Sequence, residues 1–273
     1  MKSRSEAAAG PGEVGDPTCL SKVIFRPGDP KELPWCLPAF HGLREVNLQR
    51  PVAFFVGENG TGKSMLLEGI AKACGYDLTS GSRNHLVGQA QAKSPLDGAL
   101  RLVWHRKLTR GFFFRAESFF HFASYLDRLK ADLEEIEQEV GRPLGSAQVH
   151  DAYGGRSLHT RSHGEAFWEL FSRRFRTQGL YLMDEPEAAL SPLRQLAFLV
   201  LLKQMVEEDG SQFLIATHSP IILAYPDAQI YSLDRSPLAE VGYEETESLK
   251  IVQGFLSNRE GYLRRLFQKD GQG

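Results

Sequence analysis

The chain has 273 residues, 42% of them hydrophobic and 24% charged, and its formal net charge is −2. This composition is typical of a globular protein with a core, and the near-neutral charge argues against a protein that coats nucleic acid or an anionic membrane. No apolar run approaches the roughly 20 residues of a membrane helix, so we expect no direct membrane insertion. Cys19, Cys36 and Cys74 lack disulfide or zinc spacing, which favours a cytoplasmic protein with reduced thiols.

The first half of the chain begins with a segment, residues 1–18, that is rich in Gly, Pro, Ala and charge and lacks the apolar stretch of a signal peptide. We expect a disordered tail there. Residues 77–98 are polar and Gly-rich and predict a loop. In chain order the patterns predict strands at Lys22–Arg26, Val52–Val56 and 99–107, a helix from Gly62 to about Cys74, and a helix from Phe119 to Val140.

The second half alternates apolar strands with helices, which indicates an α/β fold with a largely parallel sheet covered on both faces. Residues 240–273 predict a hairpin turn followed by two packing helices. The other elements expected are a helix opening near Ser162, strands at Gly179–Asp184, Gln212–Thr217 and Ala228–Leu233, and a helix with Ser191 as N-cap and Pro192 at its first position.

The stretch "GENGTGKS" has the spacing of a phosphate-binding P-loop, with a predicted strand before it and a helix after it. Glycines let several backbone N–H groups converge on phosphates, and the helix N-terminus adds its positive dipole end. A Gly-rich turn before a helix is the structural alternative. The candidate nucleotide-binding residues are Gly57, Asn59, Gly60, Thr61, Gly62, Lys63 and Ser64.

The stretch "LYLMDEPE" places Asp184 and Glu185 at the end of a predicted buried strand. In a P-loop protein an aspartate at this position can hold Mg²⁺ together with the P-loop serine, here Ser64. Glu185 stands one residue further on, where it could polarise an attacking water. A solvated acidic loop is the structural alternative.

Two further segments carry polar groups next to predicted elements. In "SHGE", Ser162 and Glu165 form a capping box, and a helix N-terminus with a bare Gly164 is also an anion site. In "ATHSP", His218 directly follows a buried strand, where it could reach a γ-phosphate. A histidine in a loop without such a role is the alternative.

The order "GENGTGKS", "SHGE", "LYLMDEPE", "ALSP", "ATHS" resembles that of ABC-type P-loop ATPases, and most closely the soluble branch of SMC- and RecF-type heads, among predicted AAA-domain ATPases. The resemblance implies one ATPase domain over residues 19–273, with a helical lobe at about 115–175. It implies ATP and Mg²⁺ as ligands and an ATP-dependent head-to-tail homodimer. "ALSP" resembles the D-loop that links two sites.

The resemblance also assigns roles residue by residue. Catalytic roles fall to Lys63, Glu185 as general base and His218 as switch histidine, while Ser162 and Gly164 would complete the site of the opposite copy. "GFFFRAESFF" lies where the family's Q-loop is expected, with Glu117 as a candidate metal ligand in place of glutamine. No return helix is predicted at 144–162, which favours an amphipathic helix at 119–140 over a two-stranded arm.

Three functions stay open. The first is an ATP hydrolase whose dimerisation acts as a switch, for example in DNA maintenance or phage defence, with DNA or an effector protein as partner by family analogy alone. The second is the ATP-binding subunit of a membrane transporter. The third is a module that binds ATP without hydrolysing it.

Overall fold

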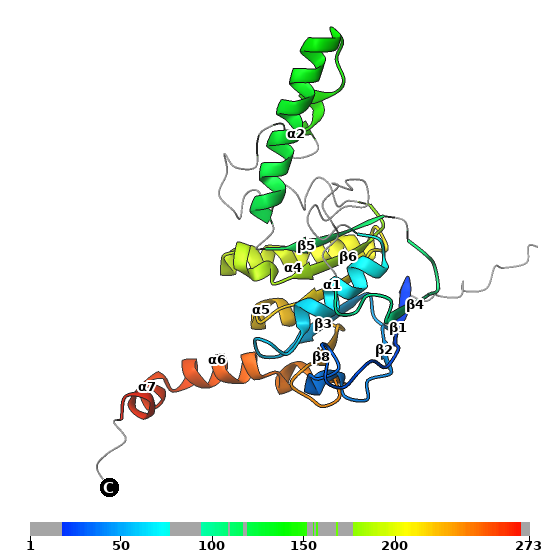
Figure 1. The fold of residues 1–273 in the computed structure, drawn as a ribbon. Helices are drawn as coiled ribbons and strands as arrows, with labels where there is room; N and C mark the ends of the chain where they lie inside the picture. The colour runs from blue at the N-terminus through cyan, green and yellow to red at the C-terminus, as the bar shows by residue number, and fades with distance from the viewer. Residues whose placement is uncertain are drawn as a thin grey trace, which may run out of the picture.

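The computed structural model describes residues 18–76, 94–108, 110–116, 119–151, 155, 157, 168 and 177–268. Its centre is a six-stranded sheet in the order β5-β6-β7-β3-β8-β9, in which every pair of neighbours is parallel except β8 and β9 (Figure 1). The α/β fold class is therefore confirmed. The strands are β3 Val52–Val56, β5 Gly111–Arg115, β6 Leu180–Asp184, β7 Gln212–Ala216, β8 Gln229–Ser232 and β9 Ala239–Glu240.

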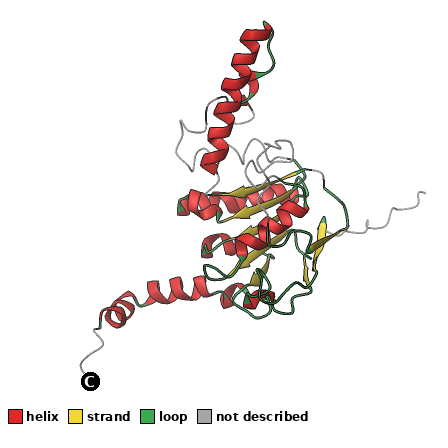
Figure 2. Cartoon of the chain, viewed as in Figure 1, coloured by secondary structure: helices red, strands yellow, loops and turns green. Residues whose placement is uncertain are grey.

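The central strands β3, β6, β7 and β8 are buried along their whole length because helices cover both faces of this sheet (Figure 2). In β3, Ala53 and Phe55 belong to the core on the side of α1 (Lys63–Ala73). Phe54 points to the opposite core, which it shares with residues of α4 (Pro192–Glu207) and α5 (Pro220–Leu223). This alternation fixes the P-loop, directly after β3, at the edge between the two layers.

A smaller antiparallel sheet lies on the α1 side, in the order β2 (Glu45–Asn47), β1 (Leu20–Phe25), β4 (Leu100–Trp104). The buried side chain of Gln212 ties it to the central sheet. Its Oε1 accepts hydrogen bonds from the backbone N–H groups of Leu20 (2.7 Å) and Cys19 (3.1 Å), and its Nε2 donates to Leu20 O (2.8 Å). Helix α1 is thereby held between two sheets.

Helix α2 (Phe119–Val140) has the predicted bounds and projects away from the sheets (Figure 1). Near its outer end the Glu137 carboxylate accepts hydrogen bonds from the Ser146 hydroxyl and from the backbone N–H groups of residues 144, 145 and 146. These bonds, led by that of the hydroxyl, lower the pKa of Glu137 to about 2. In residues 144–151 the helical structure is of the 3₁₀ type, at Ser146–Gln148 and at Asp151, and most of residues 152–162 lie outside the described residues.

Three predictions about elements need correction or fall outside the described residues. Residues 111–115, part of the stretch where the Q-loop was expected and for which no strand was predicted, form strand β5 because they pair with β6 along its whole length. Helices α6 (Glu247–Ser257) and α7 (Arg259–Phe267) were expected to pack, yet neither has a buried residue (Figure 1). The two helices contact each other instead, through the rings of Phe255 and Tyr262, whose centroids lie 5.9 Å apart. Residues 1–17, the loop at 77–93 and the helix opening at Ser162 lie outside the described residues.

The remaining described elements are 3₁₀ turns at Pro38–Phe40, Pro186–Ala189 and Tyr243–Glu245. None of the helices in the described ranges is both long enough and apolar enough to span a bilayer.

Candidate functional site

The P-loop leaves β3 and enters α1 through three glycines with positive φ angles. These are 148° at Gly57, 85° at Gly60 and 102° at Gly62, a region that side chains disfavour. At Gly62 a Cβ atom would also lie 2.8 Å from the ring of buried Phe40. The loop can therefore curl around its own N–H groups only because these positions lack side chains.

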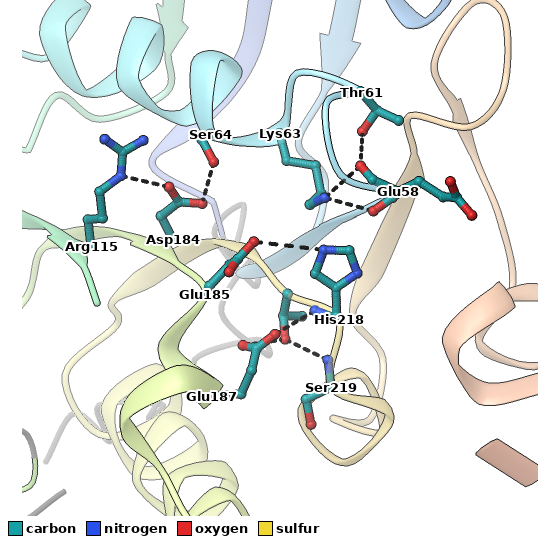
Figure 3. Close-up of polar contacts among 12 residues, drawn as sticks. Glu58, Thr61, Lys63, Ser64, Arg115, Asp184, Glu185, Glu187, His218 and Ser219 are labelled. Atoms are coloured by element: carbon teal, nitrogen blue, oxygen red, sulfur yellow. Dashed lines mark hydrogen bonds and ion pairs between the residues drawn. The ribbon is translucent and has the colours of Figure 1, made fainter. Parts of the chain in front are cut away.

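Lys63 points back into this loop, and only 4% of the residue is exposed (Figure 3). Its Nζ donates hydrogen bonds to the carbonyl oxygens of Gly57 (2.7 Å) and Glu58 (3.0 Å). Burial lowers the pKa of Lys63, against the opposing effect of nearby carboxylates, first Glu185 and then Asp184. A cation thus stands at the centre of a loop whose shape suits phosphate oxygens.

Ser64 and Asp184 meet as predicted: the Ser64 hydroxyl donates to Asp184 Oδ1 at 3.1 Å (Figure 3). The second oxygen of Asp184 accepts a hydrogen bond from Arg115 Nε at 3.0 Å, and Arg115 also forms a 2.5 Å ion pair with Glu68 of α1. A hydroxyl and a carboxylate oxygen at contact distance are the hard oxygen donors that Mg²⁺ prefers, so the donor set fits this metal.

Glu185 and His218 face one another beyond Asp184. Glu185 has a φ angle of 51°, which is strained for a residue with a side chain and turns its carboxylate away from the strand direction. Its Oε1 lies 3.7 Å from His218 Nε2 (Figure 3). Within the described part of the chain that buried nitrogen makes no hydrogen bond. The pair therefore presents an acceptor and an unsatisfied ring nitrogen to the same space.

Two carboxylates that the sequence analysis missed also belong to this region. Asp234 follows β8 and accepts the backbone N–H of Glu58 at 2.8 Å, which holds the P-loop from the side opposite α1. Glu187 accepts hydrogen bonds from the His218 backbone N–H (2.6 Å) and the Thr217 hydroxyl (2.8 Å). The available signal was their position: each follows a strand that neighbours β3 or β7 in the sheet.

Some of these groups line one cavity of about 810 Å³, whereas Lys63, Ser64 and Asp184 are not among its lining residues. Its walls come from the P-loop, from the segments after β6, β7 and β8, and from the first turn of α6. The candidate residues that line it are Gly57, Asn59, Glu185, Thr217, His218 and Asp234.

The structure brings together most of the predicted residues. Gly60, Thr61 and Gly62 lie in the same loop, where the Thr61 hydroxyl donates to Glu58 O at 2.9 Å. Ser162, Gly164 and Glu117 lie outside the described residues. At the end of β5, the predicted Q-loop region, the side chain that reaches Asp184 is Arg115, which the sequence analysis did not single out.

The chain is similar to known nucleotide-binding proteins. Residues 157–224, which include Asp184, Glu185 and His218, match the family described as "AAA domain, putative AbiEii toxin, Type IV TA system". The chain is 25% identical over 233 residues to "Probable siderophore transport system ATP-binding protein YusV" of Bacillus subtilis (strain 168), covering 78% of this chain and 79% of that protein. It is 26% identical over 212 residues to "Thiamine import ATP-binding protein ThiQ" of Rhizobium meliloti (strain 1021), covering 74% of this chain and 84% of that protein.

Among solved structures, "SMC head domain from Thermotoga maritima" aligns with a TM-score of 0.42 and 15% sequence identity, over 82% of this chain and 98% of that chain. The family match spans the carboxylates after β6 and the histidine after β7. The chain is therefore similar, in sequence and in the order of its elements, to ABC-type P-loop ATPases.

Proposed function

We propose that this chain binds ATP and hydrolyses it with Mg²⁺ as cofactor. The observation that carries the proposal is the contact between Ser64 and Asp184, 3.1 Å apart although 120 positions separate them in sequence. A chance Gly-rich turn would not need a carboxylate from another strand at its serine. The strained Glu185 next to it supplies the group that a hydrolase requires and a binding module does not.

The residues divide the chemistry as follows. Lys63 and the N–H groups of the P-loop bind the β- and γ-phosphates, with the positive end of the α1 dipole behind them. Ser64 and Asp184 would hold Mg²⁺, which when bound neutralises charge on the phosphate oxygens. Glu185 accepts a proton from, or orients, the attacking water, and His218 donates a hydrogen bond from its ring N–H to the γ-phosphate.

We further propose that ATP joins two copies of the chain head to tail. The cavity is walled by one copy through its P-loop, Glu185 and His218, and it is wide enough, at about 810 Å³, to admit groups from a second molecule. Ser162 and Gly164 of the opposite copy are the predicted groups. Hydrolysis would remove the γ-phosphate contacts that the two copies share and would loosen the dimer. ATP binding and hydrolysis would thus switch the chain between dimer and monomer.

The test is the Glu185→Gln variant, which keeps the shape of the side chain and removes its basicity. Wild type should turn over ATP with Mg²⁺, and the variant should lose this activity by a factor on the order of 10² or more. With ATP, light scattering should find the variant as a dimer, and without ATP as a monomer. A matched Glu207→Gln variant on the exposed face of α4 should behave as wild type.

The alternatives predict other results. If neither protein hydrolyses ATP above background while both bind it, the chain is a binding module. If Glu185→Gln stays monomeric when saturated with ATP, the dimer is refuted.

A second candidate function is that of an ATP-binding subunit of a transporter. It is favoured by one observation, that both curated relatives are named as transport or import ATP-binding proteins. Purification from membranes together with a membrane-spanning partner would support it. A role in DNA maintenance or phage defence stays a prediction, and DNA binding whose affinity falls steeply with salt would support it.

A further inference from the structure

Glu187 occupies an unusual place for a third carboxylate, two residues after Glu185 in the 3₁₀ turn Pro186–Ala189. Its side chain does not point to water but to the segment after β7 (Figure 3). One oxygen accepts the backbone N–H of His218 at 2.6 Å, and the other accepts the hydroxyl of Thr217 at 2.8 Å. Burial, offset in part by these hydrogen bonds, raises the pKa of Glu187.

A second tie joins the same two segments. The Ser219 hydroxyl donates to Gln195 Oε1 at 2.5 Å, and Gln195 Nε2 donates to Leu190 O at 3.1 Å. Ser219 also accepts the backbone N–H groups of residues 221 and 222, so it caps α5. The residue between the two ties is His218, whose backbone is thus fixed on both sides to the turn that follows β6.

The fixed backbone of residues 217–219 limits the positions that the His218 imidazole can reach. Thr217 is fully buried, and its hydroxyl accepts the Ser219 N–H at 3.0 Å, so the backbone around His218 has little freedom. The His218 side chain is 39% exposed and its Nε2 makes no hydrogen bond within the described part of the chain, so its direction depends on its backbone and on the 3.7 Å contact with Glu185. A donor N–H and a donor O–H side by side call for two acceptor oxygens, which a carboxylate supplies.

From this geometry we infer that Glu187 is a positioning residue for His218, holding the histidine's backbone so that its ring nitrogen faces Glu185 and the γ-phosphate position. The inference rests on the proposed function for its catalytic consequence. The hydrogen bond between the His218 N–H and Glu187 does not depend on that function, because both groups belong to this chain. Because the turn 186–190 leads into "ALSP", the segment predicted to meet the second copy, the same ties connect that face to His218.

Two substitutions separate geometry from charge. Glu187→Ala removes both acceptors. Glu187→Gln keeps one acceptor for the His218 N–H, and its amide can donate to the Thr217 oxygen, so the segment stays tied without the charge. Glu207→Ala, an exposed carboxylate on α4, is the matched control.

The first measurement is hydrogen–deuterium exchange of the amides of residues 217–219, without nucleotide. Glu187→Ala should speed exchange there by a factor on the order of ten, because a buried hydrogen bond that slows opening is lost. Glu187→Gln should stay within about threefold of wild type. Unchanged exchange in Glu187→Ala would overturn the inference.

The second measurement is ATP turnover in a double-mutant cycle with His218→Ala. Glu187→Ala should lower kcat by a factor on the order of ten, with KM within about twofold, and should cause no further loss in the His218→Ala background. Equal losses in both backgrounds, or a loss confined to KM, would show that Glu187 does not act through His218.

The outcomes for the two proposals are distinct. If wild type does not hydrolyse ATP, the proposed function fails, and the exchange measurement alone decides the role of Glu187. If Glu187→Ala does not fold, Thr217→Val replaces it. This change preserves volume and removes one of the two donors, and it should speed exchange at residue 218 while Glu207→Ala does not. No change in Thr217→Val would then refute the inference.

Discussion

Arg115 is the side chain whose removal we expect to cost the most stability for the least change in volume. Its guanidinium lies between Asp184 of β6 and Glu68 of α1, at 3.0 Å and 2.5 Å. Burial lowers the pKa of Arg115, but the charges of Glu68 and Asp184 more than offset this, so the net shift is upward. Arg115→Met keeps much of the apolar stem and leaves both carboxylates without their shared cation.

The magnitude follows from the two ion pairs and their exposure. Two opposite unit charges about 4 Å apart attract each other by about 4 kcal/mol at an effective dielectric constant of about 20. Desolvation of the three charges offsets much of this attraction. Removing one partner of a fully buried pair costs about 3–5 kcal/mol. Here the side chains of Arg115, Glu68 and Asp184 are 26%, 22% and 4% exposed, so water can solvate Glu68 after the change. We expect the free energy of unfolding to fall by about 2–3 kcal/mol.

Urea denaturation followed by tryptophan fluorescence measures this difference, with Lys203→Met as control. Lys203 forms an exposed pair with Glu207, whose side chains are 61% and 62% exposed, and its loss should cost less than about 0.5 kcal/mol. Adding Glu68→Gln to Arg115→Met should restore about 1 kcal/mol, because it removes one of the two uncompensated charges. If Arg115→Met and Lys203→Met have equal effects, the guanidinium is not a structural cation and the reasoning is refuted.

Three further predictions concern the P-loop, helix α2 and the C-terminal helices α6 and α7. Gly62→Ala should destabilise the protein by about 2 kcal/mol and abolish ATP binding, since its φ angle is 102° and the added Cβ meets Phe40; binding of a fluorescent ATP analogue tests it. Glu137 has a lowered pKa, so its contribution to stability is present above its ordinary pKa of 4.5 and is lost as pH falls through about 2; an NMR titration of its carboxyl carbon with a midpoint near 4.5 would contradict this. Deleting residues 247–273 should shift the thermal midpoint by less than about 2 °C, because neither α6 nor α7 buries a residue, and a larger loss in a calorimetric scan would count against their exposed placement.

The sheet could be predicted because apolar strand patterns and the glycine spacing of the P-loop are local signals in the sequence. Val52–Val56 is apolar throughout, Leu180–Asp184 is apolar up to its final aspartate, and both strands form as expected. The meeting of Ser64 and Asp184 was also predictable, since a P-loop fixes which strand end lies beside it. Each of the motifs behind these predictions is contained in fewer than about ten consecutive residues.

The partners of Arg115 and Glu187 could not be predicted from the sequence, because they depend on strand order. An arginine after "GFFF" is a common strand end, and only the pairing of β5 with β6 brings it to Asp184. The amphipathic pattern of Glu247–Ser257 predicted a helix correctly but could not indicate whether its own sheet had room for it. Sequence periodicity identifies a face, and only the assembled core tells which surfaces remain uncovered.

The order of the central sheet explains why so much polar chemistry gathers at one edge. Neighbouring strands β5, β6, β7, β3 and β8 are all parallel, so their carboxyl ends lie along the same side of the sheet. A side chain just after any strand is therefore next to those after its neighbours, however far apart they are in the chain. The hydrogen bond from the backbone N–H of His218 to the Glu187 carboxylate is an example, since it joins the segment after β7 to the segment after β6. In sheet order the edge carries Arg115, Asp184 with Glu185, Thr217 with His218, the P-loop with Lys63, and Asp234.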